Sequence, residues 1–213
     1  MKTVLAYGDS LTWGSVPGKA ERHARADRWP DVLAAALGNR VQVISDGLRG
    51  RSTAYDEHLA DCDRNGARLL PSALYAHAPV DLVILMLGSN DLKPGVAGTA
   101  IAAMQGMRRC AEIVKTHSAR LAGHGPADVL IVAPPPMVET ADPFYAGMLA
   151  GGVEQSAMIA SLYADLADEI DCGFFDAGSV AQASPVDGIH LDAEGTRAIG
   201  KALAPMVHVM LGL

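Results

Sequence analysis

The chain has 213 residues, of which half are hydrophobic and 19% are charged. This composition is typical of a compact globular protein rather than a disordered one, and the length favours a single domain over residues 1–213. Seventeen basic and 24 acidic residues give a net charge of −7, and the basic residues are dispersed along the chain, which argues against nucleic acid as a partner.

The N-terminal apolar stretch resembles the start of a secretion signal, but it reaches Asp9 before the usual length of about 7–15 residues. The longest later apolar run, residues 82–87, is far shorter than the roughly 20 residues that span a membrane. The three cysteines are widely separated and lack CxxC or Cys/His spacing, which indicates neither disulfides nor a zinc site. We therefore expect a cytoplasmic protein with reduced thiols, no membrane partner and no metal.

The first strand is predicted at Val4–Tyr7, which lacks the polar alternation of a strand with one solvated face. It ends at Gly8, which permits a tight turn, and Asp9 and Ser10 follow as residues that commonly cap a helix. A charged surface insertion is expected over residues 19–28. The pattern then predicts a helix at 31–37, a strand at 41–44, a helix at 65–77 that is broken or kinked near Pro71, and a central strand at 81–87.

The second half continues the alternation of helices and strands. The expected elements are a helix at 99–117, a strand at 129–133, a helix at about 154–169, a strand at 173–176 and a closing helix at 193–211, which Pro205 should kink or end early. Five strands that alternate with helices predict an α/β fold with one parallel sheet and helices on both faces. Ligands in such folds bind at the carboxyl ends of the strands.

Residues able to perform acyl transfer follow these strands. Ser10, Gly50 and Asn90 come after the first three strands, and Asp187-Gly188-Ile189-His190 lies between the last strand and the last helix. Acyl transfer needs a hydroxyl nucleophile, an imidazole base, a carboxylate that fixes the imidazole tautomer, and donors for the oxyanion. The chain has no G-x-S-x-G elbow, which argues against an ordinary α/β-hydrolase.

Four sequence blocks resemble those of the SGNH (GDSL-type) hydrolase family: Gly8-Asp9-Ser10-Leu11, Gly50, Gly88-Ser89-Asn90-Asp91 and Asp187-Gly188-Ile189-His190. Thr12-Trp13-Gly14 after the first block is similar to the bacterial arylesterase, carbohydrate acetylesterase and perhydrolase branch. The resemblance implies a flavodoxin-like three-layer α/β/α sandwich. It also implies a serine esterase without cofactor or metal, which hydrolyses short acyl esters such as aryl esters or acetylated carbohydrates and can use peroxide in place of water.

The same resemblance implies a role for each block. Ser10 is the expected nucleophile, His190 the base and Asp187 its orienting carboxylate, while the N–H groups of Ser10 and Gly50 and the Asn90 side chain form the oxyanion hole. Trp13, which follows the nucleophile turn, and Ile189 are expected to contact the substrate.

Two other functions stay open from the sequence. One is an acyl thioesterase or lysophospholipase of the same wider family, which a longer apolar pocket would favour. The other is a catalytically silent carbohydrate-binding protein that retains the fold. Of the remaining polar residues, Asp9 and Asp91 are expected to form turns, Arg49 and Arg51 either contact a polar substrate or are solvated, and the other six histidines are expected at the surface.

The segment from Met137 to Gly152 is unusually rich in large apolar residues for a connection. Apolar patches of this kind commonly mark interfaces or ligand grooves. We expect this insertion to form a pocket wall and a contact between subunits of a homo-oligomer. The alternative is that it folds back as a local hydrophobic cap.

Overall fold

Five parallel strands form one sheet in the computed structural model, which describes residues 1–117 and 124–213. The strand order is β2-β1-β3-β4-β5, so the chain reverses its direction of winding beside β1. The carboxyl ends of β1 and β3 therefore border the point where such sheets bind ligands. The strands are β1 (Lys2–Gly8), β2 (Val41–Gly47), β3 (Leu82–Met86), β4 (Asp128–Ala133) and β5 (Gly173–Asp176).

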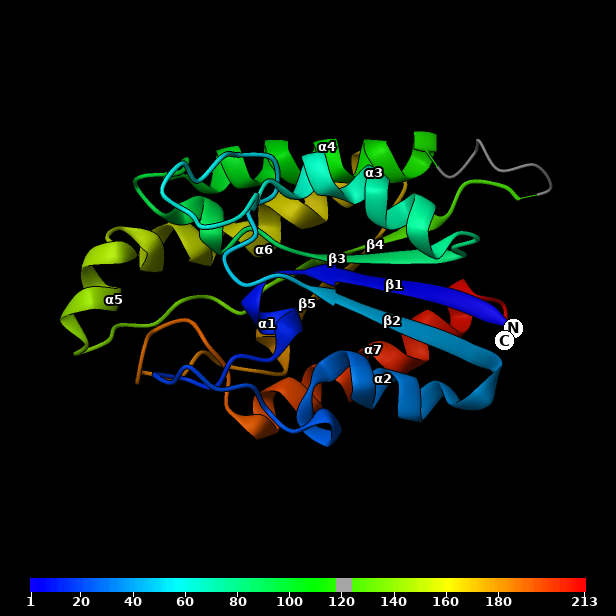
Figure 1. Cartoon of the computed structure of the whole chain (residues 1–213), viewed down its shortest axis with the longest axis horizontal. Helices are drawn as coiled ribbons and strands as arrows, with labels where there is room; N and C mark the ends of the chain where they lie inside the picture. Colours follow the sequence, from blue (N-terminus) through cyan, green and yellow to red (C-terminus); the bar gives the residue numbers. More distant parts are fainter. Residues whose placement is uncertain (118–123) are drawn as a thin grey trace.

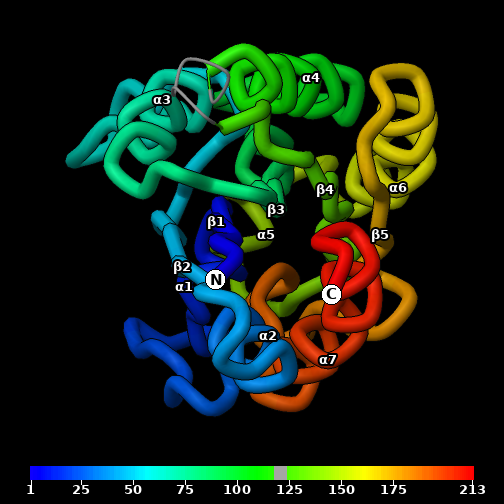
Figure 2. The backbone as a smooth tube through the Cα atoms, turned by 90° about the vertical axis from the view of Figure 1, so that its right-hand side faces the viewer, coloured from blue at the N-terminus to red at the C-terminus, as the bar shows by residue number. Residues whose placement is uncertain are grey.

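Helices cover both faces of the sheet, as predicted (Figures 1 and 2). Helices α2 (Trp29–Leu37) and α7 (Ala193–Met210) lie against one face, and α3 (Gly66–His77), α4 (Ala100–His117) and α6 (Gly152–Glu169) lie against the other. Shorter helices are α1 (Ser10–Trp13), α5 (Pro143–Met148) and the 3-10 turns η1 (Arg25–Asp27), η2 (Gly38–Arg40), η3 (Asn90–Leu92) and η5 (Ala177–Ser179). In the described part of the chain, no helix is long and apolar enough to cross a membrane.

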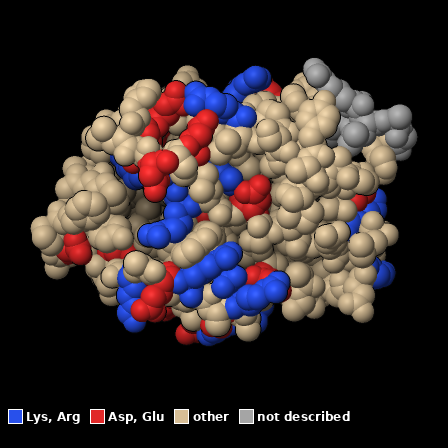
Figure 3. Space-filling model, in the orientation of Figure 1, with Lys and Arg blue, Asp and Glu red and all other residues tan. Residues whose placement is uncertain are grey.

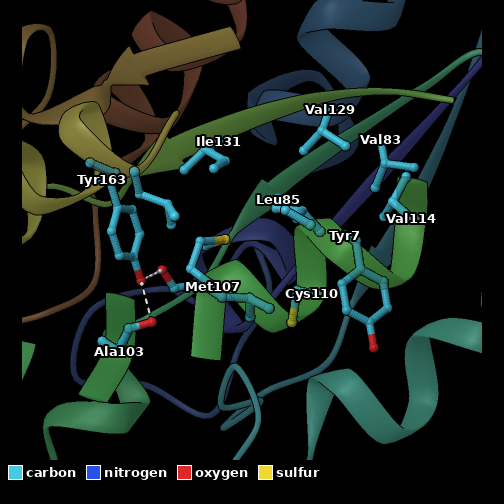
Figure 4. Close-up of a cluster of buried hydrophobic side chains, with 14 of the residues drawn as sticks. Tyr7, Val83, Leu85, Ala103, Met107, Cys110, Val114, Val129, Ile131 and Tyr163 are labelled. Carbon is cyan, nitrogen blue, oxygen red and sulfur yellow. Dashed lines mark hydrogen bonds between the residues drawn. The ribbon is translucent and has the colours of Figure 1, made fainter. Parts of the chain in front are cut away.

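The alternation of side chains along β1 builds a core on each side of the sheet. Leu5 and Tyr7 join the cluster under α3, α4 and α6, whereas Val4 and Ala6 join the cluster under α2 and α7. Figure 4 shows the first cluster, where the buried Tyr163 hydroxyl of α6 reaches the Leu87 carbonyl at 3.1 Å. Because both faces of the sheet are buried, the strands need no polar alternation.

Neither proline interrupts its helix, so a break near Pro71 and an early end of the last helix at Pro205 are both excluded. Helix α3 runs through Pro71 without a break, and α7 continues past Pro205 to Met210. Pro205 is exposed, so water can bond the carbonyl that the missing N–H leaves free, while Leu203 and Val207 on either side stay buried in the core. Packing of the helix on the sheet therefore outweighs the local cost of the proline.

Candidate active site

The predicted catalytic residues meet at the carboxyl edge of the sheet. Ser10 begins α1 after β1, Gly50 follows β2, Asn90 begins η3 after β3, and His190 precedes α7. All four line one open cavity of about 440 Å³. In Figure 1 this edge is the left end of the sheet, where α1 and α5 lie.

Ser10, His190 and Asp187 form a continuous hydrogen-bonded chain. His190 Nε2 lies 3.0 Å from Ser10 Oγ, and His190 Nδ1 lies 2.8 Å from Asp187 Oδ2. An ionised carboxylate can only accept, so Nδ1 carries the proton and Nε2 is left to accept one from the serine hydroxyl. The geometry thus supplies a nucleophile, a base and an orienting carboxylate in sequence.

The turn that presents Ser10 depends on glycines packed against it. A side chain at Gly8 would place Cβ 2.0 Å from Thr12 Oγ1, and one at Gly47 would place Cβ 2.3 Å from the Trp13 nitrogen. Asp9 then caps the short helix, because its Oδ1 accepts the Leu11 N–H at 2.9 Å. The strand-to-helix turn is consequently tight, and Ser10 remains only 6% exposed.

Asp187 is fully buried but accepts several hydrogen bonds. Its Oδ1 accepts the N–H groups of Ile189 and His190, and its Oδ2 accepts Nδ1–H of His190 and the Gly18 N–H. Burial alone would raise the pKa of this carboxyl, but the bonds from His190 and Gly18 lower it to about 2. Asp187 is therefore an anion at neutral pH, as a partner of an imidazolium must be.

Asn90 and Gly50, the residues predicted to donate to an oxyanion, line the same cavity as Ser10. Asn90 Nδ2 is held 3.2 Å from Asp9 Oδ2 and 3.2 Å from the Arg51 carbonyl. Gly50 has φ of +81°, and a Cβ there would lie 2.7 Å from an Arg64 nitrogen. Only glycine therefore lets the backbone turn at this point of the cavity wall.

Two further carboxyls are buried beneath the site. Burial raises the pKa of Asp9 to about 6 and that of Asp91 to about 7, although both groups accept hydrogen bonds. The Asp91 carboxylate accepts the N–H of Thr53 at 3.0 Å and also the Thr53 hydroxyl. Asp9 therefore links the turn after β1 to Asn90, and Asp91 links η3 to Thr53, in agreement with the role as hydrogen-bond partners in turns expected from the sequence.

The cavity has a charged side and an apolar side. Lys93 and Arg64 share Glu57, with nitrogen to oxygen distances of 3.2 and 3.1 Å, and Asp61 pairs with Arg64. Figure 3 shows basic atoms beside the hollow in the left half of the face. The apolar side is formed by Leu48, Phe144, Tyr145, Met148 and Ile189. Insertion residues 137–152 thus contribute three of the lining side chains.

Of the two residues predicted to contact the substrate, Ile189 lines the cavity, whereas Trp13 is not among the lining residues. The guanidinium carbons of Arg22 and Arg49 lie 4.9 and 5.3 Å from the centroid of the Trp13 ring. Because Arg49 lines the cavity, Trp13 supports the wall through that side chain. Among the described residues, no group of three or more His, Cys, Asp or Glu side chains could hold a metal ion.

The solvated alternative for Arg51 is excluded, and the expectation that His23 lies at the surface was wrong. Arg51 is buried at 4% exposure, donating to the Gly8 carbonyl at 2.9 Å and to the Asp46 carboxylate at 2.8 Å. His23 is also buried, and its Nε2 lies 2.9 Å from the Leu191 carbonyl. No local sequence pattern marks either residue, because the Gly8 and Leu191 carbonyls that they contact lie 43 and 168 positions away along the chain.

A family model described as the GDSL-like lipase/acylhydrolase family matches residues 6–198. The chain belongs to this family. Family membership, together with the solved structures that it resembles, makes the protein a carboxylic ester hydrolase. A search of the curated proteins gave no match.

Several solved structures resemble this chain over nearly its whole length. A carbohydrate acetylesterase family member from Sinorhizobium meliloti is 60% identical with a TM-score of 0.97, and each chain is covered completely. A second carbohydrate acetylesterase from Sinorhizobium meliloti is 38% identical with a TM-score of 0.94. The aryl esterase of M. smegmatis is 39% identical with a TM-score of 0.93. Both of these matches cover 99% of this chain and 100% of the other.

Proposed function

We propose that this GDSL-family hydrolase cleaves short-chain acyl esters, acetyl esters foremost, through an acyl-enzyme on Ser10. The single observation that carries the proposal is the chain from Ser10 Oγ to His190 Nε2 and from His190 Nδ1 to Asp187 Oδ2, at 3.0 and 2.8 Å. A base in this position raises the nucleophilicity of a hydroxyl that is otherwise weak. The alcohol portion of the ester is a phenol or a carbohydrate hydroxyl, so that the substrates are aryl esters or acetylated carbohydrates, in keeping with the solved relatives.

In the first half of the reaction, Ser10 Oγ attacks the ester carbonyl and its proton passes to His190 Nε2. The carbonyl oxygen becomes an oxyanion, and His190 then protonates the leaving alcohol as the carbon–oxygen bond breaks. In the second half, water gives a proton to His190 and attacks the acyl carbon. His190 then returns this proton to Ser10 Oγ as the bond between Oγ and the acyl carbon breaks, which releases the acid and restores Ser10. Hydrogen peroxide in place of water would give a peracid at this step.

The oxyanion is held by donors from three turns. Ser10 is the first residue of α1, so its N–H has no acceptor within the helix and is free to point at a ligand. The Gly50 N–H and the Asn90 carboxamide complete the set, and both residues line the cavity. Both Nδ2 hydrogens of Asn90 face acceptors, Asp9 Oδ2 and the Arg51 carbonyl, so one of these bonds must break when Asn90 donates to the oxyanion. The N–H groups of Ser10 and Gly50 are positioned by the backbone of their turns and stabilise the developing charge.

The lining favours a small acyl group. The Tyr145 ring stands edge-on to His190 with a centroid distance of 6.3 Å, and Phe144 and Met148 lie on the same side of the cavity. These side chains narrow the space for a long acyl chain, whereas the charged side suits a polar alcohol. An acyl thioesterase or lysophospholipase would instead need a longer apolar surface.

We further propose that the enzyme is a cytoplasmic homo-oligomer that uses the insertion at residues 137–152 as a subunit contact. Phe144 at the start of α5 is 71% exposed, although large aromatic groups are usually buried. Met137 and Leu149 of the same insertion are buried, which leaves Phe144 for an external contact. Light scattering at micromolar concentration tests this, and a fully active monomer would exclude it.

The test of the function is labelling with a fluorophosphonate, which reacts with an activated serine. We expect the wild-type protein to be labelled at Ser10, and Ser10→Ala to be unlabelled and inactive while it remains folded, because this small hydroxyl contributes little to the core. His190→Ala should also abolish labelling. A wild-type protein that is not labelled would support a silent binding protein.

A series of aryl esters from acetyl to octanoyl, compared with acetylated sugars and acyl thioesters, defines the substrate. The proposal predicts the highest kcat/KM for acetyl esters. Highest activity on long acyl chains or on thioesters would favour the thioesterase or lysophospholipase. Hydrolysis at the wild-type rate by Ser10→Ala would exclude Ser10 as the nucleophile.

A further inference from the structure

A small hairpin after the nucleophile turn reaches across to the far end of the catalytic residues. We define residues 15–23 as the strap. It begins at the end of α1, where the Ser10 carbonyl accepts the N–H groups of Gly14 and Ser15 at 2.9 and 3.0 Å. Ser15 and Arg22 then form an antiparallel bridge. The base of the strap is thus attached directly to the residue that carries the nucleophile.

The tip of the strap contacts the catalytic carboxylate. The Gly18 N–H donates to Asp187 Oδ2 at 2.7 Å, and this is the same oxygen that accepts the His190 Nδ1 proton. Gly18 has φ of +65°, which favours glycine, and a Cβ at this position would lie 2.6 Å from Val186 Cγ1. We call the segment from Asp187 to Leu191 the catalytic loop. The strap and the catalytic loop therefore pack closely at this point, although Gly18 belongs to an exposed hairpin.

The far end of the strap contacts the chain on the other side of His190. His23 Nε2 lies 2.9 Å from the Leu191 carbonyl, and because a carbonyl only accepts, this nitrogen must carry the proton. His23 is 9% exposed, and its own N–H donates to the Gly14 carbonyl at 2.8 Å. The strap thus bonds the catalytic loop three residues before His190 and one residue after it.

We propose that the strap is a positioning element of the catalytic site, in which the Gly18 N–H orients the Asp187 carboxylate and His23 fixes the backbone beside His190. The proposal rests on the proposed function, since it takes Ser10, His190 and Asp187 as the catalytic residues. The N–H groups of Ile189 and His190 hold Oδ1 of Asp187, and the Gly18 N–H is the second donor, beside His190 Nδ1, on Oδ2. Gly18 therefore adds a restraint on the oxygen that faces the imidazole. The strap does not touch the reacting atoms and acts through Asp187 and His190.

The sharpest test replaces Gly18 by glycolic acid through nonsense suppression. This change puts an ester oxygen in place of the N–H and adds no side chain. We expect kcat for an acetyl ester to fall about 10- to 100-fold with KM nearly unchanged, as for the loss of a hydrogen bond to a charged group. Lactic acid in place of Ala20, an exposed residue of the same strap, is the matched control and should leave kcat near the wild-type value.

A double-mutant cycle shows whether the strap acts through Asp187. In the Asp187→Asn background, the Gly18 ester should have little further effect, because the charged acceptor is already lost. Effects that multiply would overturn the proposal, and so would an unchanged kcat for the Gly18 ester alone. If Asp187→Asn alone left kcat unchanged, the proposed function would fail instead, which separates the two outcomes.

His23 gives a second measurement that does not depend on the ester. His23→Leu removes the donor to the Leu191 carbonyl and should lower kcat, whereas His23→Gln retains an N–H and should restore most of it. Circular dichroism establishes that each variant is folded. Wild-type kcat in a folded His23→Leu protein would overturn the role of His23, and failure of Gln to restore activity would show that the contact is one of packing alone.

Discussion

Asn90 Nδ2 lies 3.2 Å from Asp9 Oδ2, so the carboxamide proposed to bind the oxyanion is held by the residue that precedes the nucleophile. Asp9 also caps the helix that Ser10 begins. The buried Asp9 carboxylate therefore contacts both the turn of the proposed nucleophile and the proposed oxyanion donor, which follow different strands. This contact joins the first and third sequence blocks in the structure.

Asn90→Ala should lower kcat for acetyl esters by about 10²–10³ with less effect on KM, because the amide acts mainly on charge that develops in the transition state. Steady-state kinetics measure the change. Asn39→Ala, at an exposed position in η2, is the control and should be neutral. An unchanged kcat in Asn90→Ala would remove Asn90 from the oxyanion hole.

Asp187→Asn should lower kcat by up to about 10⁴, because an amide can favour the wrong imidazole tautomer. Asp192→Asn is the matched control, since Asp192 caps α7 at 2.7 Å from the Gly195 N–H and lies only two residues after His190. The control should affect stability more than kcat. Similar losses of kcat in both variants would mean that Asp187 contributes through folding alone.

Asp91→Asn should change how stability depends on pH. Burial raises the pKa of Asp91 to about 7, so the folded state retains a proton that the unfolded chain releases above about pH 4. The contribution of Asp91 to the free energy of unfolding therefore falls as pH rises from about 4 to 7. Asparagine mimics the protonated form, so the variant should gain stability relative to wild type as pH rises through this range.

Denaturant unfolding of both proteins between about pH 5 and pH 8 measures this difference. Parallel stability curves would contradict the prediction. Asp187 acts in the opposite sense, because its pKa is lowered to about 2 and its stabilising contribution is lost as pH falls toward that value. The two effects occupy separate pH ranges and can be measured independently.

Gly106→Ala should destabilise the protein by about 1–3 kcal/mol, although alanine is the better helix former by about 1 kcal/mol. A Cβ at Gly106 in α4 would lie 1.8 Å from Thr53 Oγ1, the hydroxyl that donates to Asp91. Gly147→Ala in α5 is the control, because no atom lies within 4 Å of the added Cβ. If both variants gained stability, the close contact at Thr53 would not constrain the site.

The sheet could be predicted because each strand is an apolar run that ends in a turn. The strand at residues 173–176 was predicted with its observed bounds, but β2 extends from the expected Ile44 to Gly47. Its polar end stays in the sheet because Ser45 to Gly47 pair with Ala6 to Gly8 of β1. Such pairing is a property of the neighbouring strand, which a local pattern does not contain.

The residues proposed as catalytic were predictable for a different reason, since the four sequence blocks that contain them together resemble those of one known family. The supporting residues were not predictable, because their contacts span long distances along the chain. Gly18 and Asp187 are separated by 169 positions, and His23 and Leu191 by 168. The sequence around Gly18 and His23 is typical of a solvated, charged loop. Their contacts with the catalytic loop exist only in the folded protein and could not be predicted from the local sequence.

The 180 positions between Ser10 and His190 also affect how the enzyme is made. At about 5–20 residues per second, a ribosome adds the histidine roughly 10–40 s after the serine. During that time β1 and β2 can emerge and pair, but the nucleophile has no base and the strap has no loop to bind. Ser10 therefore lacks its proposed base until His190 has been added, and the proposed hydrolysis can begin only after that point.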